Sequence, residues 1–260
     1  MQPLDLERHR DLSGIVVLAL RLLRDHLGVF TALALIFVAP VTLLVDGVWG
    51  GLLADFDASV PVVVQVVGGL IDTLVVVPLV TAAHVVAVCG LGRGEAPSVP
   101  RSLRGGLAAF PAVVLVVLLY VLAVALGLLL LFVPGVWLLV RWYFGTQAVM
   151  VDGRRGPDAL RRSAELVAGH WWRTAGMVLM ILVLGTLLGV MVGGPLALAA
   201  VVVESGALFV IAQILGLALA YSFAALVGTL LFFDLRARHD PTPTKDAAGA
   251  LGPRGAHNHS

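Results

Sequence analysis

Six runs of apolar residues dominate this chain, and five of them are long enough to cross the hydrocarbon core of a bilayer. An α-helix rises about 1.5 Å per residue, so about 20 apolar residues span that core. With 60% hydrophobic and only 13% charged residues, a soluble fold could not cover its apolar surface. The same composition excludes intrinsic disorder. We therefore predict an all-α integral membrane protein. The runs are residues 27–45, 61–89, 107–132, 136–151, 174–192 and 206–233, of which 136–151 is marginal.

The distribution of basic residues predicts how these runs cross the membrane. Cytoplasmic loops carry the excess of Arg and Lys. Sixteen of the 17 basic residues lie before the first run, after the sixth, or in the loops that follow the second and fourth runs. Six transmembrane helices, arranged as three hairpins with both termini cytoplasmic, place all sixteen on one side. A re-entrant fourth segment is rejected because it would break this partition.

Short basic segments precede the first, third and fifth runs and share a small-Leu-Arg pattern. Those around Arg21 and Arg161 have one charged and one apolar face, as amphipathic helices do. We predict interfacial helices before spans 1, 3 and 5. The expected organisation is a cytoplasmic segment at 1–26, a membrane domain at 27–235 and a disordered cytoplasmic tail at 236–260.

These basic segments form a candidate face for lipid or partner contacts. A basic residue beside an anionic leaflet gains about 1 kcal/mol, so the expected partners are anionic lipids of the cytoplasmic leaflet or an unknown membrane protein. The other interpretation is that the segments only anchor the topology. The net charge of +1 gives no indication of nucleic-acid binding. The candidate residues are Arg21, Arg24, Arg101, Arg104, Arg161, Arg162, Trp171, Trp172 and Arg173.

A few polar residues fall inside the apolar runs, where an ionisable group is a functional hypothesis by default. Depth counted from the helix ends places Arg141, Asp72 and Gln213 in one layer of the outer half. We expect Arg141 and Asp72 to form a buried pair, with Gln213 or Gln65 hydrogen-bonded nearby. The pair could fix helix packing or bind a substrate or ion. Alternatively, Arg141 snorkels to the outer interface.

Glycine residues mark the fifth run. Gly193-Gly194-Pro195 is expected to break or kink it, because proline cannot continue a regular helix. Gly185, Gly189 and Gly193 form a small-xxx-small row, which permits close helix approach within the molecule or across a dimer.

Three short stretches carry a resemblance to a known family: residues 134–142 (PGVWLLVRW), residues 159–163 (ALRRS) with 169–173 (GHWWR), and residues 232–238 (FFDLRAR). Together they resemble bacterial membrane proteins grouped with the glycerophosphoryl diester phosphodiesterase membrane domain, which is common in actinobacteria. The resemblance implies a six-helix module in the bacterial cytoplasmic (inner) membrane, sometimes fused to a catalytic domain. The tail from His239 is too short to be that domain, so the resemblance implies no activity for this chain.

The predicted function is a non-catalytic membrane module that acts through lipid or protein contacts at the cytoplasmic face. The runs hold few ionisable groups and show no HExxH, GxSxG or carboxylate cluster, so we predict neither an enzyme nor a cofactor or metal site. The alternative is a small-solute or ion transporter or channel that uses the Arg141 and Asp72 layer.

Overall fold

The computed structural model describes residues 4–6, 9–53, 55–56 and 60–240, and every regular element in these ranges is a helix. Five helical segments are long and apolar enough to cross a membrane, which confirms the predicted all-α fold of the membrane type. The elements are α1 (Leu12–Asp25), α2 (Leu27–Thr42), the π-helical η1 (Leu43–Trp49), α3 (Val62–Ile71), the π-helical η2 (Asp72–Val76), α4 (Val77–Gly92), α5 (Val99–Leu130), α6 (Phe132–Arg141), α7 (Gly145–Asp152), α8 (Pro157–Val167), α9 (Trp171–Val202) and α10 (Gly206–His239).

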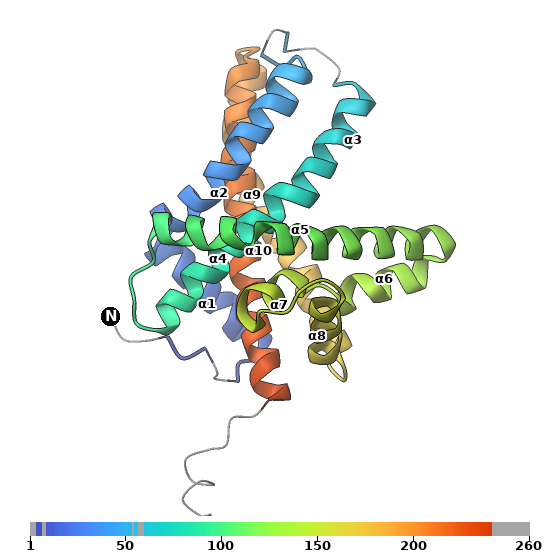
Figure 1. Ribbon diagram of the computed structural model, residues 1–260. Coiled ribbons are helices and arrows are strands. Elements are labelled where there is room, and N and C mark those ends of the chain that lie inside the picture. The colour runs from blue at the N-terminus through green and yellow to red at the C-terminus, as the bar shows by residue number, and fades with distance from the viewer. Residues whose placement is uncertain (1–3, 7–8, 54, 57–59, 241–260) are drawn as a thin grey trace, which may run out of the picture.

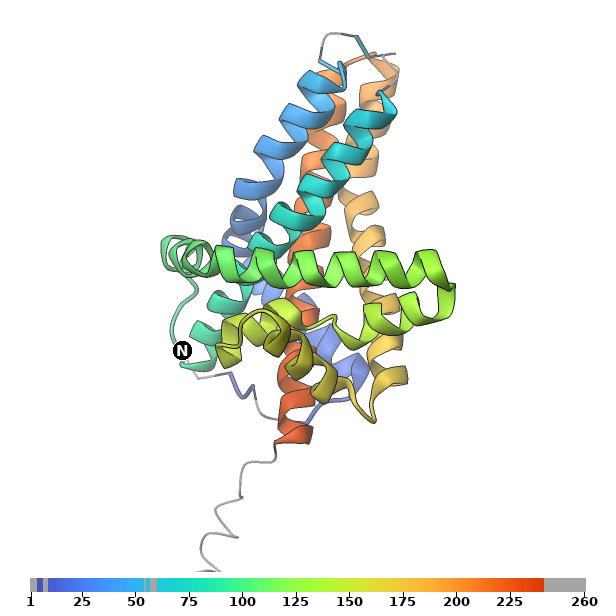
Figure 2. The ribbon, with the colours of Figure 1, turned by 45° about the vertical axis from the view of Figure 1, so that its right-hand side comes forward.

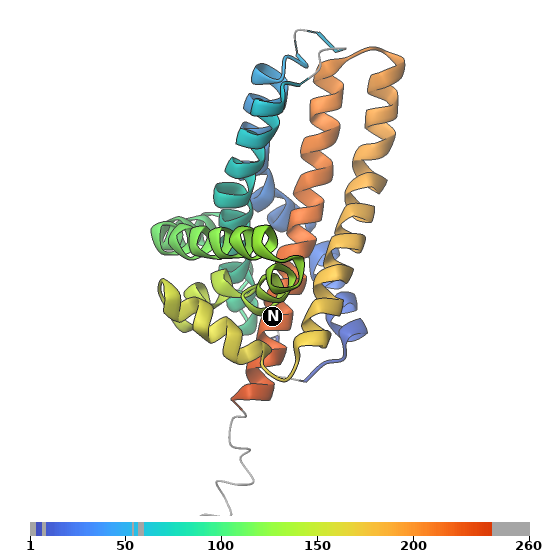
Figure 3. The same cartoon turned by 90° about the vertical axis from the view of Figure 1, so that its right-hand side faces the viewer.

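Four of the five long segments stand side by side as a bundle (Figures 1 and 3). They are α2 with η1, α3 with η2 and α4, then α9, and finally α10. α10 packs along α9 and also contacts α2 and α4, and its residues 225–235 are all buried. The turns after η1 and α9 lie at one end of the bundle, here termed the loop end. α1, α8 and the last turn of α10 lie toward the opposite end, here termed the basic end.

The fifth long segment, α5, runs across the bundle rather than along it (Figure 2). It packs on α4 where two glycines allow close approach: a Cβ at Gly106 would lie 3.1 Å from the backbone nitrogen of Ala83. α6 then folds back beside α5, so the two helices form a hairpin whose tip projects from the bundle. At this tip the side chains of residues 129–133 are 69–83% exposed, although all are apolar.

The predicted fourth span, residues 136–151, is wrong as a single helix. Its residues divide between α6 and α7, which have 10 and 8 residues and so reach only about 15 and 12 Å. The turn between them is held from outside by Ser163 of α8, whose hydroxyl accepts a hydrogen bond from the Phe144 N–H and donates one to the Arg141 carbonyl. Neither helix is long enough to cross the hydrocarbon core.

Two of the three predicted interfacial helices are separate elements. α1 buries Ile15 and Ala19 and exposes Arg21, and α8 is amphipathic in the same way. The segment before the third span is instead the first turns of α5, because no break follows it. The predicted tail begins inside α10, which continues to His239. Residues 241–260 lie outside the described part of the chain.

The glycine row of the fifth run serves packing within the molecule. The fifth run was expected to break or kink at Gly193-Gly194-Pro195, and the break is wrong, because α9 continues through Pro195 to Val202. A Cβ at Gly193 would lie 2.6 Å from the Ala212 carbonyl oxygen of α10, and one at Gly189 would lie 3.0 Å from that of Gly216. Close contact with α10 therefore explains why this face of α9 lacks side chains.

Candidate functional site

The structure brings Asp72 and Gln65 together in one pocket near the loop end. The polar residues that line this pocket include Asp46, Gln65, Asp72 and Tyr221. The Tyr221 hydroxyl donates a hydrogen bond to Oδ2 of Asp72 at 2.5 Å. Asp72 opens the π-helical stretch η2, and Pro78 follows that stretch. Because proline has no N–H, it disturbs the hydrogen bonds of the preceding turn.

The structure places Arg141 in a different environment from Asp72. Its guanidinium carbon lies 4.6 Å from the ring centroid of Trp137, which is cation–π geometry. None of the ion pairs among the described residues includes Arg141, and Asp72 is bonded to Tyr221 instead. The expected Arg141–Asp72 pair is therefore absent from the described contacts, because α6 is not the crossing helix that the depth count assumed.

Gln213 of α10 is not among the residues that line the Asp72 pocket. Its Oε1 is buried without a hydrogen-bond partner among the described residues. Gln65 lies on α3 and uses its side-chain amide to bond the Val60 carbonyl at 3.0 Å. Of the four predicted members of the buried polar cluster, two share a site and two do not.

A second, more enclosed pocket also has Tyr221 in its lining and lies between η2, α4, α5, α7 and α10. Its lining combines apolar residues with five residues that carry a hydroxyl group and with Gln147 of α7, which is 3% exposed. This pocket was not predicted from the sequence, because the residues of α7 were expected to belong to a continuous transmembrane helix. The clustering of Tyr143, Thr146 and Gln147 within five residues of an apolar run was the available signal.

An apolar groove lies beside the α5–α6 hairpin. One part of its wall is formed by α6, through Phe132, Val133, Val136 and Trp137. The other part is formed by α9, through the adjacent Trp171 and Trp172. Trp171 donates a hydrogen bond from Nε1 to the Trp137 carbonyl at 3.4 Å and meets the Trp172 ring edge-on. Trp172 remains 83% exposed. Arg141 lies over the Trp137 ring, so a positive charge stands beside this groove.

Two members of the predicted lipid-binding face are used for internal contacts. The side chain of Arg162 is only 13% exposed and pairs with Asp152 of α7 at 2.8 Å and with Asp240. The side chain of Arg173 is 22% exposed and pairs with Asp234. Both are therefore better described as structural residues, since their charges are already neutralised.

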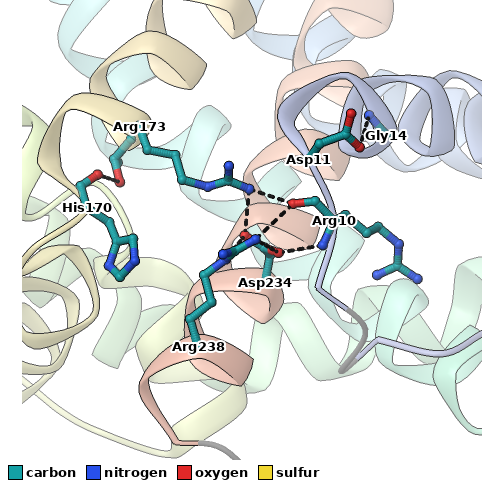
Figure 4. A network of polar contacts seen from close by, with 8 residues as sticks. Arg10, Asp11, Gly14, His170, Arg173, Asp234 and Arg238 are labelled. Carbon is teal, nitrogen blue, oxygen red and sulfur yellow. Dashed lines mark hydrogen bonds and ion pairs between the residues drawn. The ribbon is translucent and has the colours of Figure 1, made fainter.

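The Arg173 contact belongs to a network that ties three segments together at the basic end (Figure 4). The carboxylate of Asp234 is completely buried and accepts hydrogen bonds from Arg173, Arg238 and the Arg10 backbone N–H, at 2.8–3.2 Å. The Arg10 carbonyl in turn accepts bonds from Arg173 and Arg238. The network joins the segment before α1 to the start of α9 and the end of α10.

The remaining basic residues of the predicted face are exposed: Arg21, Arg24, Arg101, Arg104 and Arg161. Some have acidic neighbours on the surface, such as Asp25 beside Arg24 at 3.0 Å and Glu95 beside Arg101. Exposed pairs of this kind contribute little to stability. These side chains are therefore free to exchange their partners for other anions.

Comparison with known proteins adds no identification: no family model matches this chain, and no curated protein or solved structure matches it significantly. The class of protein rests on the fold, which is an all-helical chain with five helices of membrane-crossing length and composition in its described part.

Proposed function

We propose that this chain is a non-catalytic membrane module that binds anionic lipid in the groove beside the α5–α6 hairpin. The observation that carries the proposal is Arg141, which lies over Trp137 at an apolar groove and has no ion-pair partner among the described residues. An acyl chain fits the apolar walls, and a phosphate headgroup supplies the negative counter-charge that the Arg141 guanidinium lacks. The exposed arginines of the basic end add electrostatic attraction to the same leaflet.

We further propose that the bundle crosses the membrane four times, with both termini in the cytoplasm. The α5–α6 hairpin then lies in the cytoplasmic leaflet, because its chain leaves from and returns to the same side. Trp171 and Trp172 are at the level of this hairpin, as expected for an aromatic belt at the interface. A helical hairpin that enters and leaves the membrane on the same side keeps all basic loop residues on that side. Six spans do the same, so the distribution of charge alone does not distinguish the two topologies.

The membrane we propose is a bacterial cytoplasmic membrane, as implied by the resemblance to the glycerophosphoryl diester phosphodiesterase membrane domain. The support for this resemblance is the three short stretches, which contribute Trp137, Arg141, Ser163, Trp171 and Asp234 to the groove, the α6–α7 turn and the buried network.

Lipid selectivity tests the main proposal. Protein purified in an uncharged detergent should unfold at a higher temperature with added phosphatidylglycerol than with phosphatidylcholine. Arg141→Gln should lose most of this difference, whereas Arg155→Gln, which changes an exposed arginine that does not line the groove, should retain it. The difference should shrink at high salt, since screening weakens exposed charges. Equal effects of the two lipids on the wild-type protein would reject the proposal.

Solute transport is the second candidate function. The specific observation in its favour is that Tyr221 lines both pockets and bonds Asp72, which lines one of them. Reconstituted liposomes should then show a solute or proton flux that Tyr221→Phe alters. No such flux is expected if the chain is only a lipid-binding module.

A further inference from the structure

The α5–α6 hairpin carries a long apolar surface that the described part of the chain leaves uncovered. The sequence contains no charged residue between Arg104 and Arg141. An exposed leucine recurs every three or four residues along α5, which places these leucines on one side of the helix as far as the hairpin tip. A continuous apolar surface of this size marks contact with lipid or with protein. The leucines, here termed the leucine stripe, are 39–83% exposed: Leu115, Leu118, Leu122, Leu126 and Leu129.

The height at which α5 crosses the bundle favours lipid as the partner of this stripe. α5 meets α4 where Gly106 packs on Ala83. Ala83 lies 21 residues after the start of α3 and nine residues before the end of α4, which is about 31 and 14 Å along this segment. The hydrocarbon core is about 30 Å thick. Beside a segment that crosses the membrane, α5 therefore lies in the leaflet at the basic end, where acyl chains reach the stripe.

The hairpin adds volume to only one half of the bundle, whereas the four crossing segments occupy both halves. Beyond Gly106, α5 continues for 24 residues to Leu130, which is about 36 Å at a helix width of about 10 Å. α6 returns beside it (Figure 2). None of the described helices lies across the bundle at its loop end (Figure 3). In a bilayer the protein is therefore wider in one leaflet than in the other.

We infer that this chain senses and promotes membrane curvature, with the leaflet that holds the hairpin on the convex side. A body inserted into one leaflet enlarges that leaflet relative to the other, and bending relieves the difference in area. Helices that lie in one leaflet bind in a curvature-dependent way for the same reason. The inference rests on the four-crossing topology proposed above, under which the membrane bulges toward the cytoplasm. It does not depend on lipid binding at Arg141.

Tethers pulled from giant vesicles test this inference, because the outer leaflet of a tether is strongly convex. The full chain, in a Cys89→Ala background, is reconstituted into phosphatidylcholine and labelled with a membrane-impermeant maleimide, which reaches only outward-facing cysteines. Arg155→Cys reports molecules whose basic end faces outward, and Val203→Cys reports the opposite orientation. Relative to a lipid dye, the first should be enriched about twofold in the tether and the second depleted to a similar extent. Equal partitioning of the two, or the reverse order, would overturn the inference.

Matched variants assign the sorting to the hairpin. Leu122→Asn combined with Leu126→Asn places two amides on the leucine stripe, so its burial in hydrocarbon becomes costly and most of the enrichment should be lost. Leu179→Asn combined with Leu182→Asn is the control, since these leucines are 61% and 66% exposed on α9, which occupies both leaflets. Unchanged sorting by the folded stripe variant would contradict the role of the hairpin. If that variant fails to fold, the comparison of the two orientations still decides.

Further measurements separate this inference from the proposals above. Arg141→Gln should sort as its parent does in uncharged lipid, and loss of sorting would assign it to the groove instead of the hairpin. Labelling of Val133→Cys in intact cells reads the topology by itself. Six crossings would remove the topology and the inference together, whereas four crossings without sorting would remove the inference alone. A dimer in detergent that the stripe variant dissociates would mean that a second copy covers the stripe, and would also overturn the inference.

Discussion

The buried carboxylate of Asp234, near the end of α10, accepts a hydrogen bond from the guanidinium of Arg173 at the start of α9, at 2.9 Å. Arg238, one turn further along α10, bonds the same carboxylate. The two basic residues therefore share one buried counter-charge, and this carboxylate also accepts a hydrogen bond from the Arg10 backbone N–H. The ends of two long helices and the segment before α1 are held by this single acidic side chain.

Asp234→Ala should destabilise the protein strongly. The substitution leaves Arg173 and Arg238 without their carboxylate in a largely buried position, which costs about 2–4 kcal/mol. We expect a lower unfolding temperature and less monodisperse protein in detergent. Asp25→Ala is the control, since Asp25 pairs with Arg24 on the exposed surface and its loss should change little. Similar melting of the two variants would contradict the structural role of the network.

Ser163→Ala should loosen the turn between α6 and α7. The Ser163 hydroxyl is completely buried and satisfies both the Phe144 N–H and the Arg141 carbonyl, at 3.1 and 3.0 Å. Its removal leaves a buried donor and a buried acceptor unpaired, at a cost of about 1–3 kcal/mol. Thermal unfolding of the purified variant measures the loss. Ser13→Ala, which removes an exposed hydroxyl from α1, should leave the unfolding temperature nearly unchanged.

The sequence predicts those parts of this fold that depend on local pattern. Apolar runs identify the long helices, and the amphipathic periodicity identifies α1 and α8. The α6–α7 turn was not predictable in this way, because Ser163 stabilises it from a different helix. The depth predicted for Arg141 was wrong for a related reason. It was counted along a helix assumed to span the membrane, and α6 is too short to do so. By contrast, Gln65 and Asp72 are two helical turns apart, and this spacing does predict a shared face.

Gly193→Ala and Gly194→Ala should have opposite effects on stability. A Cβ at Gly193 would lie 2.6 Å from the Ala212 carbonyl oxygen, so α9 and α10 would have to separate. The nearest atom to a Cβ at Gly194 is a side-chain carbon of Val190 at 3.5 Å, which is an ordinary contact. Alanine there gains helix propensity of about 1 kcal/mol. Unfolding temperatures of the two variants test this difference, and equal temperatures would argue against the close contact between α9 and α10.

Acid should weaken the contact between Arg162 and Asp240. The hydrogen bond from Arg162 lowers the pKa of Asp240 below its ordinary value, and the nearby charge of Arg236 acts in the same direction. Because the folded-state pKa is lowered, this stabilisation is present above the unfolded pKa of about 3.9 and is lost as the pH falls through the folded value. The unfolding temperature of Asp240→Asn should therefore fall less on acidification than that of the wild-type protein. The difference should be small, since the Asp240 side chain is 49% exposed. If the unfolding temperatures of Asp240→Asn and the wild-type protein fell equally with pH, this ion pair would not contribute to stability.

Cysteine labelling should distinguish four crossings from six. The background is Cys89→Ala, which removes the single native thiol. Val203→Cys at the loop end should react with a membrane-impermeant maleimide in intact cells, and Arg155→Cys should react only after permeabilisation. Val133→Cys lies at the tip of the α5–α6 hairpin and is the informative position, because its side chain is 75% exposed in the protein. If the hairpin lies in the cytoplasmic leaflet, this cysteine stays unreactive in intact cells. Six spans would instead place it in an outer loop, where it would react as Val203→Cys does, and that result would overturn the four-crossing topology.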